Sequence, residues 1–235
     1  IAKYEYEILN KLIAVTYPDM APIHYSYDQR GRMQQLIYPG GIEVVYSYDA
    51  ADRLIAVNFL GVKVEYHYDQ ATNTLSKIVF PNGITTEYEY DKAKRIVSVF
   101  HRRSDKTLIT GFQYIFDGNG NRIQVEEFSK DGSRITEYSY DRLNRLISVK
   151  YPGGVEKYTY DALGNRLTKE TSSELVKYEY DQNNHLIKAG DSQFFYDGRG
   201  NLIKKINGNK KIEYVFDAHD NLIEYRDKEY EISYS

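Results

Sequence analysis

The sequence predicts an all-β protein of about 22 short antiparallel strands, built as tandem β-hairpins in one long, curled sheet. A phrase of the form aromatic, any residue, aromatic, acid recurs eleven times with a period of about 20 residues, which is typical of a repeat array. Tyrosine, which is enriched in strands, contributes 25 of 235 residues, and tryptophan is absent. Residues that favour turns stand on both sides of each phrase. Because open twisted sheets rarely exceed about ten strands without curling or splitting, a sheet of this length is expected to curl.

The two aromatic residues of each phrase define one face of a strand. The second of them stands at Tyr6, Tyr27, Tyr48, Tyr68, Tyr90, Phe116, Tyr140, Tyr160, Tyr180, Tyr196 and Phe216. Side chains two residues apart in a strand point to the same face, so both aromatic residues share it. The residue between them is polar in eight of the eleven copies, which indicates that the opposite face is wetter. The tyrosine face is therefore expected to pack.

The acid that ends each phrase opens a tight turn. It is Asp in ten copies and Glu7 in the first. Three residues later comes a residue that tolerates a left-handed backbone, at Asn10, Gly31, Asp52, Gly120, Asn144, Gly164, Asn184, Gly200 and Asp220; only Thr72 and Lys94 differ. This pattern is typical of type I turns, in which the carboxylate accepts a bond from the backbone N–H two residues on. In five copies the residues assigned to this structural role are Tyr27, Asp28, Gly31, Tyr48, Asp49, Asp52, Tyr140, Asp141, Asn144, Tyr160, Asp161, Gly164, Tyr196, Asp197 and Gly200.

The return strands end in a second kind of turn, rich in Pro and Gly, as at 38–41 (YPGG), 80–83 (FPNG) and 151–154 (YPGG). Each repeat is then two antiparallel strands, and residues 1–235 are expected to form a single array of about eleven repeats, a fragment of a longer chain. The motif is still present at 230–234 (YEISY). Because repeat arrays need capping units, we expect unpaired strand edges at both ends, and hence edge-to-edge self-association or continuation into a longer shell.

Composition excludes several classes of function. A chain of this length can bury a sizeable core. The net charge of −3 and the pI near 6.0 give no electrostatic basis for binding nucleic acid or an anionic membrane. No run of 18 apolar residues is long enough to span a bilayer, and the absence of cysteine excludes disulfides and thiolate chemistry.

Candidates for catalysis or metal binding are weak. Each aspartate of the repeat has a turn to stabilise, which favours a structural role over general acid or metal-ligand roles. The segment 117–122 (DGNGNR) approaches a calcium-loop pattern but lacks the later Gly and Glu, so it is interpreted as a Gly-rich turn. The histidines show no metal-ligand spacing, and no catalytic triad signature appears; they are His24, His67, His101, His185 and His219. The sequence therefore predicts no enzyme, no metal site and no cofactor.

Several copies have the form YDxxGRL, as at 27–33 (YDQRGRM), 116–123 (FDGNGNRI), 160–167 (YDALGNRL) and 196–203 (YDGRGNLI). With these motifs the chain resembles the Rhs or YD-repeat family from Tyr4 to about Tyr234. The resemblance implies a sheet that spirals into a hollow shell. In polymorphic toxins and insecticidal toxin complexes such a shell encloses a toxic C-terminal domain, and in teneurins similar repeats lie at the cell surface. The self-cleaving core of toxin members, with its paired aspartates, is absent from this sequence, so the resemblance implies the scaffold role alone.

Two functions from different classes follow. The leading one is a structural segment of a secreted or surface-exposed Rhs-type protein, whose partners are the rest of its own chain or an enclosed toxin domain. The alternative is a surface module that binds carbohydrate or a partner protein through its Tyr-rich face or through a long connection at 100–112. That connection carries the candidate binding residues His101, Arg102, Arg103 and Lys106. The regular spacing of the tyrosines favours packing ladders over sugar platforms, and so favours the structural role.

Overall fold

The computed structural model describes residues 1–228 and 230–233, and in these residues it contains 23 strands and no helix. The predicted all-β fold with about 22 strands is confirmed. Tyr234, which ends the last trace of the repeat, lies outside the described residues. No helix able to cross a membrane is present in the described residues. The chain divides into two compact units, Ile1–Ile115 with Val125–Arg134, and Phe116–Gln124 with Ile135–Ser235.

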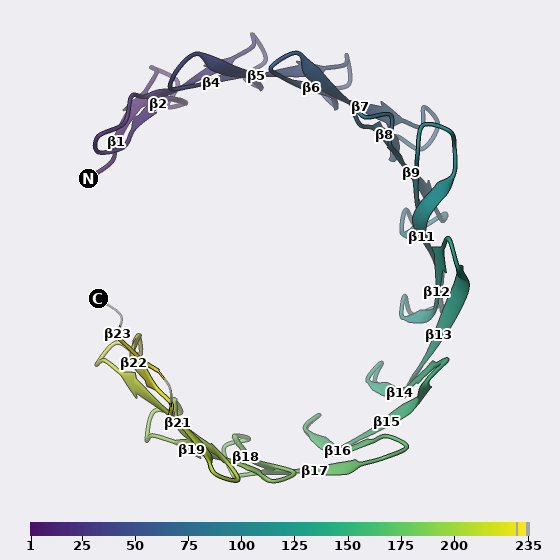
Figure 1. The fold of residues 1–235 in the computed structure, drawn as a ribbon, viewed down its shortest axis with the longest axis vertical. Helices are drawn as coiled ribbons and strands as arrows, with labels where there is room; N and C mark the ends of the chain where they lie inside the picture. The colour runs from purple at the N-terminus through teal and green to yellow at the C-terminus, as the bar shows by residue number, and fades with distance from the viewer. Residues whose placement is uncertain (229, 234–235) are drawn as a thin grey trace. The chain divides into compact units, whose positions relative to one another are not determined.

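The first unit is a meander in which each strand pairs antiparallel with the next (Figure 1). Its strands are β1 (Lys3–Tyr6), β2 (Leu12–Thr16), β3 (Ile23–Tyr27), β4 (Met33–Tyr38), β5 (Ile42–Tyr48), β6 (Leu54–Phe59), β7 (Val62–Tyr68), β8 (Leu75–Val79), β9 (Thr85–Tyr90), β10 (Ile96–Arg102) and β11 (Leu108–Phe116). Two further strands, β12 (Arg122–Ser129) and β13 (Gly132–Tyr140), contribute residues to both units.

The second unit repeats the same antiparallel meander. Its strands are β14 (Leu146–Tyr151), β15 (Gly154–Tyr160), β16 (Arg166–Glu170), β17 (Leu175–Tyr180), β18 (Leu186–Ala189), β19 (Ser192–Tyr196), β20 (Leu202–Asn207), β21 (Lys210–Phe216), β22 (Leu222–Arg226) and β23 (Glu231–Ser233). Figure 1 shows that the strands of each unit lie side by side, in chain order, in one curved layer.

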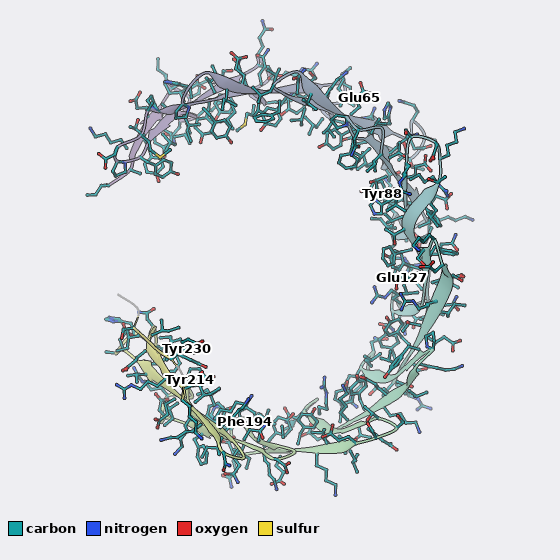
Figure 2. The ribbon with its side chains drawn as sticks, viewed as in Figure 1. Glu65, Tyr88, Glu127, Phe194, Tyr214 and Tyr230 are labelled. Carbon is teal, nitrogen blue, oxygen red and sulfur yellow. The ribbon has the colours of Figure 1, made fainter. Side chains whose placement is uncertain are left out.

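Strand register places the aromatic residues of each unit on one face. In the first unit Tyr46 pairs with Val57, which pairs with Val64, so these side chains share a face. Figure 2 shows Tyr88 on the concave side of this unit and Glu65 on its convex side. We call the tyrosine side the aromatic face and the other side the polar face.

A single curved layer buries few side chains completely. Among the described residues, the buried apolar ones are Ala14, Val15 and Ala56, at 3–4% exposure. A chain of this length could bury a larger core, but in the described residues no second layer covers either face within a unit. Stability in such a layer comes from the backbone ladder and from contacts between side chains of neighbouring strands.

A β-bulge recurs in the hairpins at acidic turns. In the hairpin of β5 and β6, Ser47 pairs with Ala56 but Tyr48 pairs with Leu54, so Ile55 is an extra residue in the return strand. The same shift recurs just before the second aromatic residue in the hairpins that begin with β1, β3, β7, β9, β13, β15, β17, β19 and β21. The bulge disrupts the ladder locally, so a polar group there needs another partner.

Candidate functional site

The repeated acidic turn is the most regular polar feature of the molecule, and the turn at Asp49 shows its geometry. The Asp52 backbone N–H donates to the Asp49 carbonyl (3.2 Å), and the Asp49 N–H donates to the Arg53 carbonyl (3.0 Å). The Asp49 carboxylate accepts from the N–H groups of Ala51 (2.9 Å) and Arg53 (3.0 Å) and from Arg53 Nε (2.7 Å). Asp52 has a left-handed backbone, with φ of 64°. One aspartate therefore stabilises the whole turn.

The same bonds recur at the other aspartates assigned to turns. The carboxylate accepts backbone N–H groups two and four residues on at Asp28, Asp91, Asp117, Asp141, Asp161, Asp181, Asp197 and Asp217. The two irregular copies are also closed by left-handed residues. Lys94 is itself left-handed, with φ of 60°, whereas the turn at Asp69 is one residue longer and is closed by Asn73 instead of Thr72.

These hydrogen bonds leave the carboxylates poorly suited to proton transfer. The side-chain bond from Arg32 lowers the pKa of Asp28, and the Asn165 amide lowers the pKa of Asp161 in the same way. The backbone N–H of Arg53 is the largest cause of the lowered pKa of Asp49. A carboxylate stabilised in its ionised form is a weak general acid near neutral pH. In the described residues, no three or more His, Asp or Glu side chains gather into a group that could hold a metal ion.

In several phrases the second aromatic residue is a tyrosine whose hydroxyl ties its repeat to the preceding one. The Tyr48 hydroxyl donates to the Met33 carbonyl (2.8 Å), and the Tyr160 hydroxyl donates to the Leu146 carbonyl (2.7 Å). Equivalent bonds join Tyr27 to Leu12, Tyr68 to Leu54, Tyr140 to Arg122 and Tyr196 to Leu186. The acceptor carbonyls lie at the bulges, where the regular ladder is interrupted. The tyrosine column is thus a seam of hydrogen bonds between successive hairpins.

The aromatic face of the first unit carries exposed rings near its Pro/Gly turns. Tyr17, Tyr38, Phe59 and Phe80 stand 21 residues apart in the sequence and are 46%, 38%, 45% and 36% exposed. In the second unit Tyr151 ends β14 with an exposed ring, but polar Asn207 ends β20. We call the four residues of the first unit the rim aromatics. They are the exposed surface that best fits a binding role.

A polar network interrupts the aromatic face of the second unit. Glu156 pairs with Val149 across the strands and forms an ion pair with Lys169 (3.1 Å); it also accepts a hydrogen bond from the Tyr158 hydroxyl. Burial, followed by the bond to Glu156, raises the pKa of Tyr158 to about 12. The Arg166 guanidinium lies 5.0 Å from the centre of the Tyr158 ring. Sequence reasoning missed this network.

The signal that could have revealed this network is a change of residue class at one position. Two residues before the first tyrosine of a phrase stand Val44, Val64 and Val176, whereas the phrase of Tyr158 has Glu156 at this position. A charged residue at a position that faces the tyrosines needs a partner on the neighbouring strand. Lys169 meets that need.

The predicted binding connection at 100–112 is wrong as a loop. Strand β10 continues to Arg102 and β11 begins at Leu108, so only 103–107 connects them. His101 Nδ1 lies 2.9 Å from the Thr86 hydroxyl, while Arg102 Nε lies 3.6 Å from Glu87. The longer step in the repeat is taken up by longer strands, because β10 and β11 have seven and nine residues.

The four candidate residues of that connection do not form one site. His101 shares the aromatic face with Thr86, its partner across the strands, and Arg102 contacts the ring of Phe100. Arg103 and Lys106 begin and close the turn, where the Lys106 N–H donates to the Arg103 carbonyl (2.9 Å).

Comparisons with known proteins identify relatives of this architecture. The family model described as "Teneurin YD-shell" matches residues 2–84 and 83–235. No curated protein sequence matches the chain. The crystal structure of TcdB2-TccC3-Cdc42 aligns with a TM-score of 0.74 at 15% identity, over 95% of this chain and 14% of that chain. The crystal structure of TcdB2-TccC3 aligns with a TM-score of 0.64 at 14% identity, over 97% of this chain and 16% of that chain.

A third similar structure is the Tc holotoxin pore of Photorhabdus luminescens, with a TM-score of 0.58 at 16% identity, over 91% of this chain and 14% of that chain. The chain therefore spans 14–16% of the length of these three solved structures. At such identities the similarity concerns the fold.

Proposed function

The chain belongs to the Teneurin YD-shell family, as the predicted YD-repeat motifs indicated, and we propose that it is a structural segment of a β-sheet wall that encloses or presents another domain. In this proposal residues 1–235 act as one array of about eleven repeats within a longer, secreted or surface-exposed protein. The domain behind the wall is a toxin or effector. The similar toxin-complex structures support this proposal through their fold.

The observation that carries the proposal is the seam of tyrosine hydrogen bonds. A wall needs a joint that can be repeated from hairpin to hairpin, and the bond from Tyr48 to Met33 has equivalents at Tyr27, Tyr68, Tyr140, Tyr160 and Tyr196, with lengths of 2.7–3.1 Å. The turn aspartates accept hydrogen bonds within their own turns, as Asp49 does from Ala51 and Arg53. The polar residues of the repeat are thus used for architecture, which supports a scaffold role over catalysis.

Limited proteolysis of the full natural polypeptide tests this function. An enclosed domain is expected to be cleaved much more slowly in the intact protein than as an excised domain, because the wall excludes the protease. Protection should disappear at the denaturant concentration at which the β-sheet signal is lost. Cleavage of that domain at the same rate in the intact and excised forms would contradict the container role.

The rim aromatics favour one alternative, a surface module that binds carbohydrate or a partner protein. Exposed aromatic rings can stack on sugar rings, and their exposure of 36–46% leaves surface available. A glycan array with the native chain and the Tyr17→Ala/Tyr38→Ala double variant tests it, with Tyr25→Ala as the control on a less exposed ring. Micromolar binding corresponds to about 8 kcal/mol, more than incidental stacking supplies. We expect no such binding; saturable binding lost only in the double variant would favour the binding module.

A further inference from the structure

Side chains along the acidic-turn edge form a second joint between neighbouring repeats. We define the donor position as the residue four after the turn acid, and the acceptor position as the left-handed residue of the next repeat. Within the units, the donor and acceptor pairs are Lys11–Gly31, Arg32–Asp52, Arg53–Asn73, Asn121–Asn144, Arg145–Gly164, Asn165–Asn184, His185–Gly200 and Asn201–Asp220. The turn at Asp69 is left out as a donor because it is one residue longer and Asn73 closes it. In the pairs given, each Asn donor faces Asn or Asp, and each Gly acceptor faces a cation or His.

The length of an Asn side chain explains its choice of neighbour. Asn165 Nδ2 donates to Asp161 of its own turn (2.9 Å) and to the Asn184 side-chain oxygen of the next repeat (3.1 Å). Asn121 makes the same pair of bonds, to Asp117 (3.0 Å) and to Asn144 (2.7 Å). In these joints the short amide reaches the next repeat through a side-chain oxygen, which Gly lacks.

An Arg donor reaches further and does not depend on that oxygen. Arg145 Nη1 donates to the Asp161 backbone carbonyl (2.8 Å) in the turn that Gly164 closes, and the Arg145 guanidinium lies 4.9 Å from the centre of the Tyr160 ring. Arg32 shows that the same reach is compatible with a side-chain acceptor. It contacts the Asp49 carbonyl (3.3 Å) and the Asp52 carboxylate (2.6 Å).

We propose that these two positions specify which repeat follows which. An Asn donor requires Asn or Asp at the next acceptor position, whereas an Arg donor accepts Asn, Asp or Gly. The donor and acceptor residues then determine whether two hairpins can be neighbours. An Asn donor that faces Gly is the one mismatched combination. The rule is independent of what the sheet encloses or binds, so it stands apart from the proposed function.

A double-mutant cycle at one joint of the second unit tests the rule. The four proteins are the native chain, Asn184→Gly, Asn165→Arg, and the double variant Asn165→Arg/Asn184→Gly. Amide hydrogen exchange in β16 and β17 reports the local opening of the joint. The native chain, Asn165→Arg and the double variant have donor and acceptor pairs that occur at other joints, namely Asn with Asn, Arg with Asn and Arg with Gly. Their amides should therefore exchange at similar rates. Asn184→Gly alone creates the mismatch, and its amides should exchange about fivefold faster, as expected for one lost hydrogen bond.

Two control variants separate the rule from the intrinsic preferences of glycine. Asn10 is also left-handed, with φ of 62°, and no side-chain donor forms a hydrogen bond with it in the described part of the chain. Asn10→Gly measures the backbone effect of the substitution in β1 and β2, and it should leave exchange there nearly unchanged. Asn184→Asp keeps the acceptor oxygen, as Asp220 does beside Asn201 (2.7 Å), and should exchange like the native chain.

The rule is overturned if Asn184→Gly changes exchange no more than Asn10→Gly does. It is also overturned if Asn165→Arg fails to restore protection to the Asn184→Gly variant. If Asn184→Gly does not fold, recovery of the fold in the double variant supports the rule, and its failure there contradicts it.

Discussion

A turn of the first unit and a turn of the second have the same backbone but use different side chains to reach the next hairpin. In the first unit Arg32 covers the ring of Tyr48, with 4.6 Å between guanidinium and ring centre, and forms an ion pair with Asp52. In the second unit Asn165 makes only short neutral and charge-assisted hydrogen bonds to Asp161 and Asn184. The same turn and strand pairing therefore allow either a long cationic side chain, Arg32, or a short amide side chain, Asn165, to reach the next hairpin. The difference indicates that the backbone turn and tyrosine seam are common to both units, while the side-chain joint varies.

Removing a seam tyrosine should have the largest effect and should separate the two kinds of joint. Tyr48→Ala and Tyr140→Ala each remove a half-buried ring and a hydroxyl bond, so each should cost about 2–3 kcal/mol of unfolding free energy. Tyr48→Ala should cost about 0.5–1 kcal/mol more, because Arg32 loses its cation–π contact. Urea unfolding measures both values. Equal losses would show that the guanidinium contributes nothing through the ring.

A side chain at a left-handed glycine should have the next largest effect. Gly164 has φ of 94° and nothing within 4 Å of the place where a Cβ would stand, so Gly164→Val acts through the backbone alone. The expected loss is about 1–2 kcal/mol. Gly198→Val is the matched control in the second unit, because Gly198 has equally open space and no left-handed backbone. Equal melting temperatures for the two variants would contradict the left-handed backbone of Gly164.

Removing only the seam hydroxyl should have a smaller effect that is the same in both units. Tyr48→Phe and Tyr140→Phe each lose one bond of similar length, to Met33 (2.8 Å) and to Arg122 (2.9 Å). Each variant should lose about 1 kcal/mol in urea unfolding, because a backbone carbonyl loses its partner. A clear difference between the two would mean that the donor side chain also sets the strength of the seam.

A change of pH should have the smallest effect on stability of the changes considered. The lowered pKa values of Asp28 and Asp161 imply stability that is present above the unfolded pKa of about 3.8 and is lost as the pH falls through the folded values. Tyr158 acts at the other extreme, because its pKa is raised to about 12. Its contribution is complete below pH 10 and is lost as the pH rises towards 12. Melting temperatures from pH 2 to pH 12 should therefore fall at both ends, and Tyr158→Phe should remove that residue's part of the alkaline fall.

Much of the fold follows from interactions within a few residues, which is why the sequence predicts it well. The aromatic residues two apart predict the packed face, and Asp followed three residues later by Gly, Asn or Asp predicts the turn. The departures have local causes as well. The turn at Asp69 gains one residue, so that Asn73 closes it, and β10 and β11 lengthen where the sequence pattern indicated a loop.

Partners across strands could not be predicted in the same way. Tyr48 and Met33 are 15 residues apart, and Arg32 and Asp52 are 20 apart, so their contact depends on the register of several strands. In the hairpin of β5 and β6 a bulge shifts that register by one residue at Leu54, whose carbonyl accepts the hydrogen bond from Tyr68. The network of Glu156, Lys169 and Tyr158 depends on the same alignment.

By itself, the sequence determined the strands, the turns and the face that carries the tyrosines, because these depend on backbone preferences and side-chain alternation over two to four residues. Only the tertiary structure decided which carbonyl each tyrosine binds, which residue each donor side chain reaches, and that each unit remains a single layer. These features depend on strand register and curvature, which are set by the sum of many weak contacts between hairpins and not by any one turn.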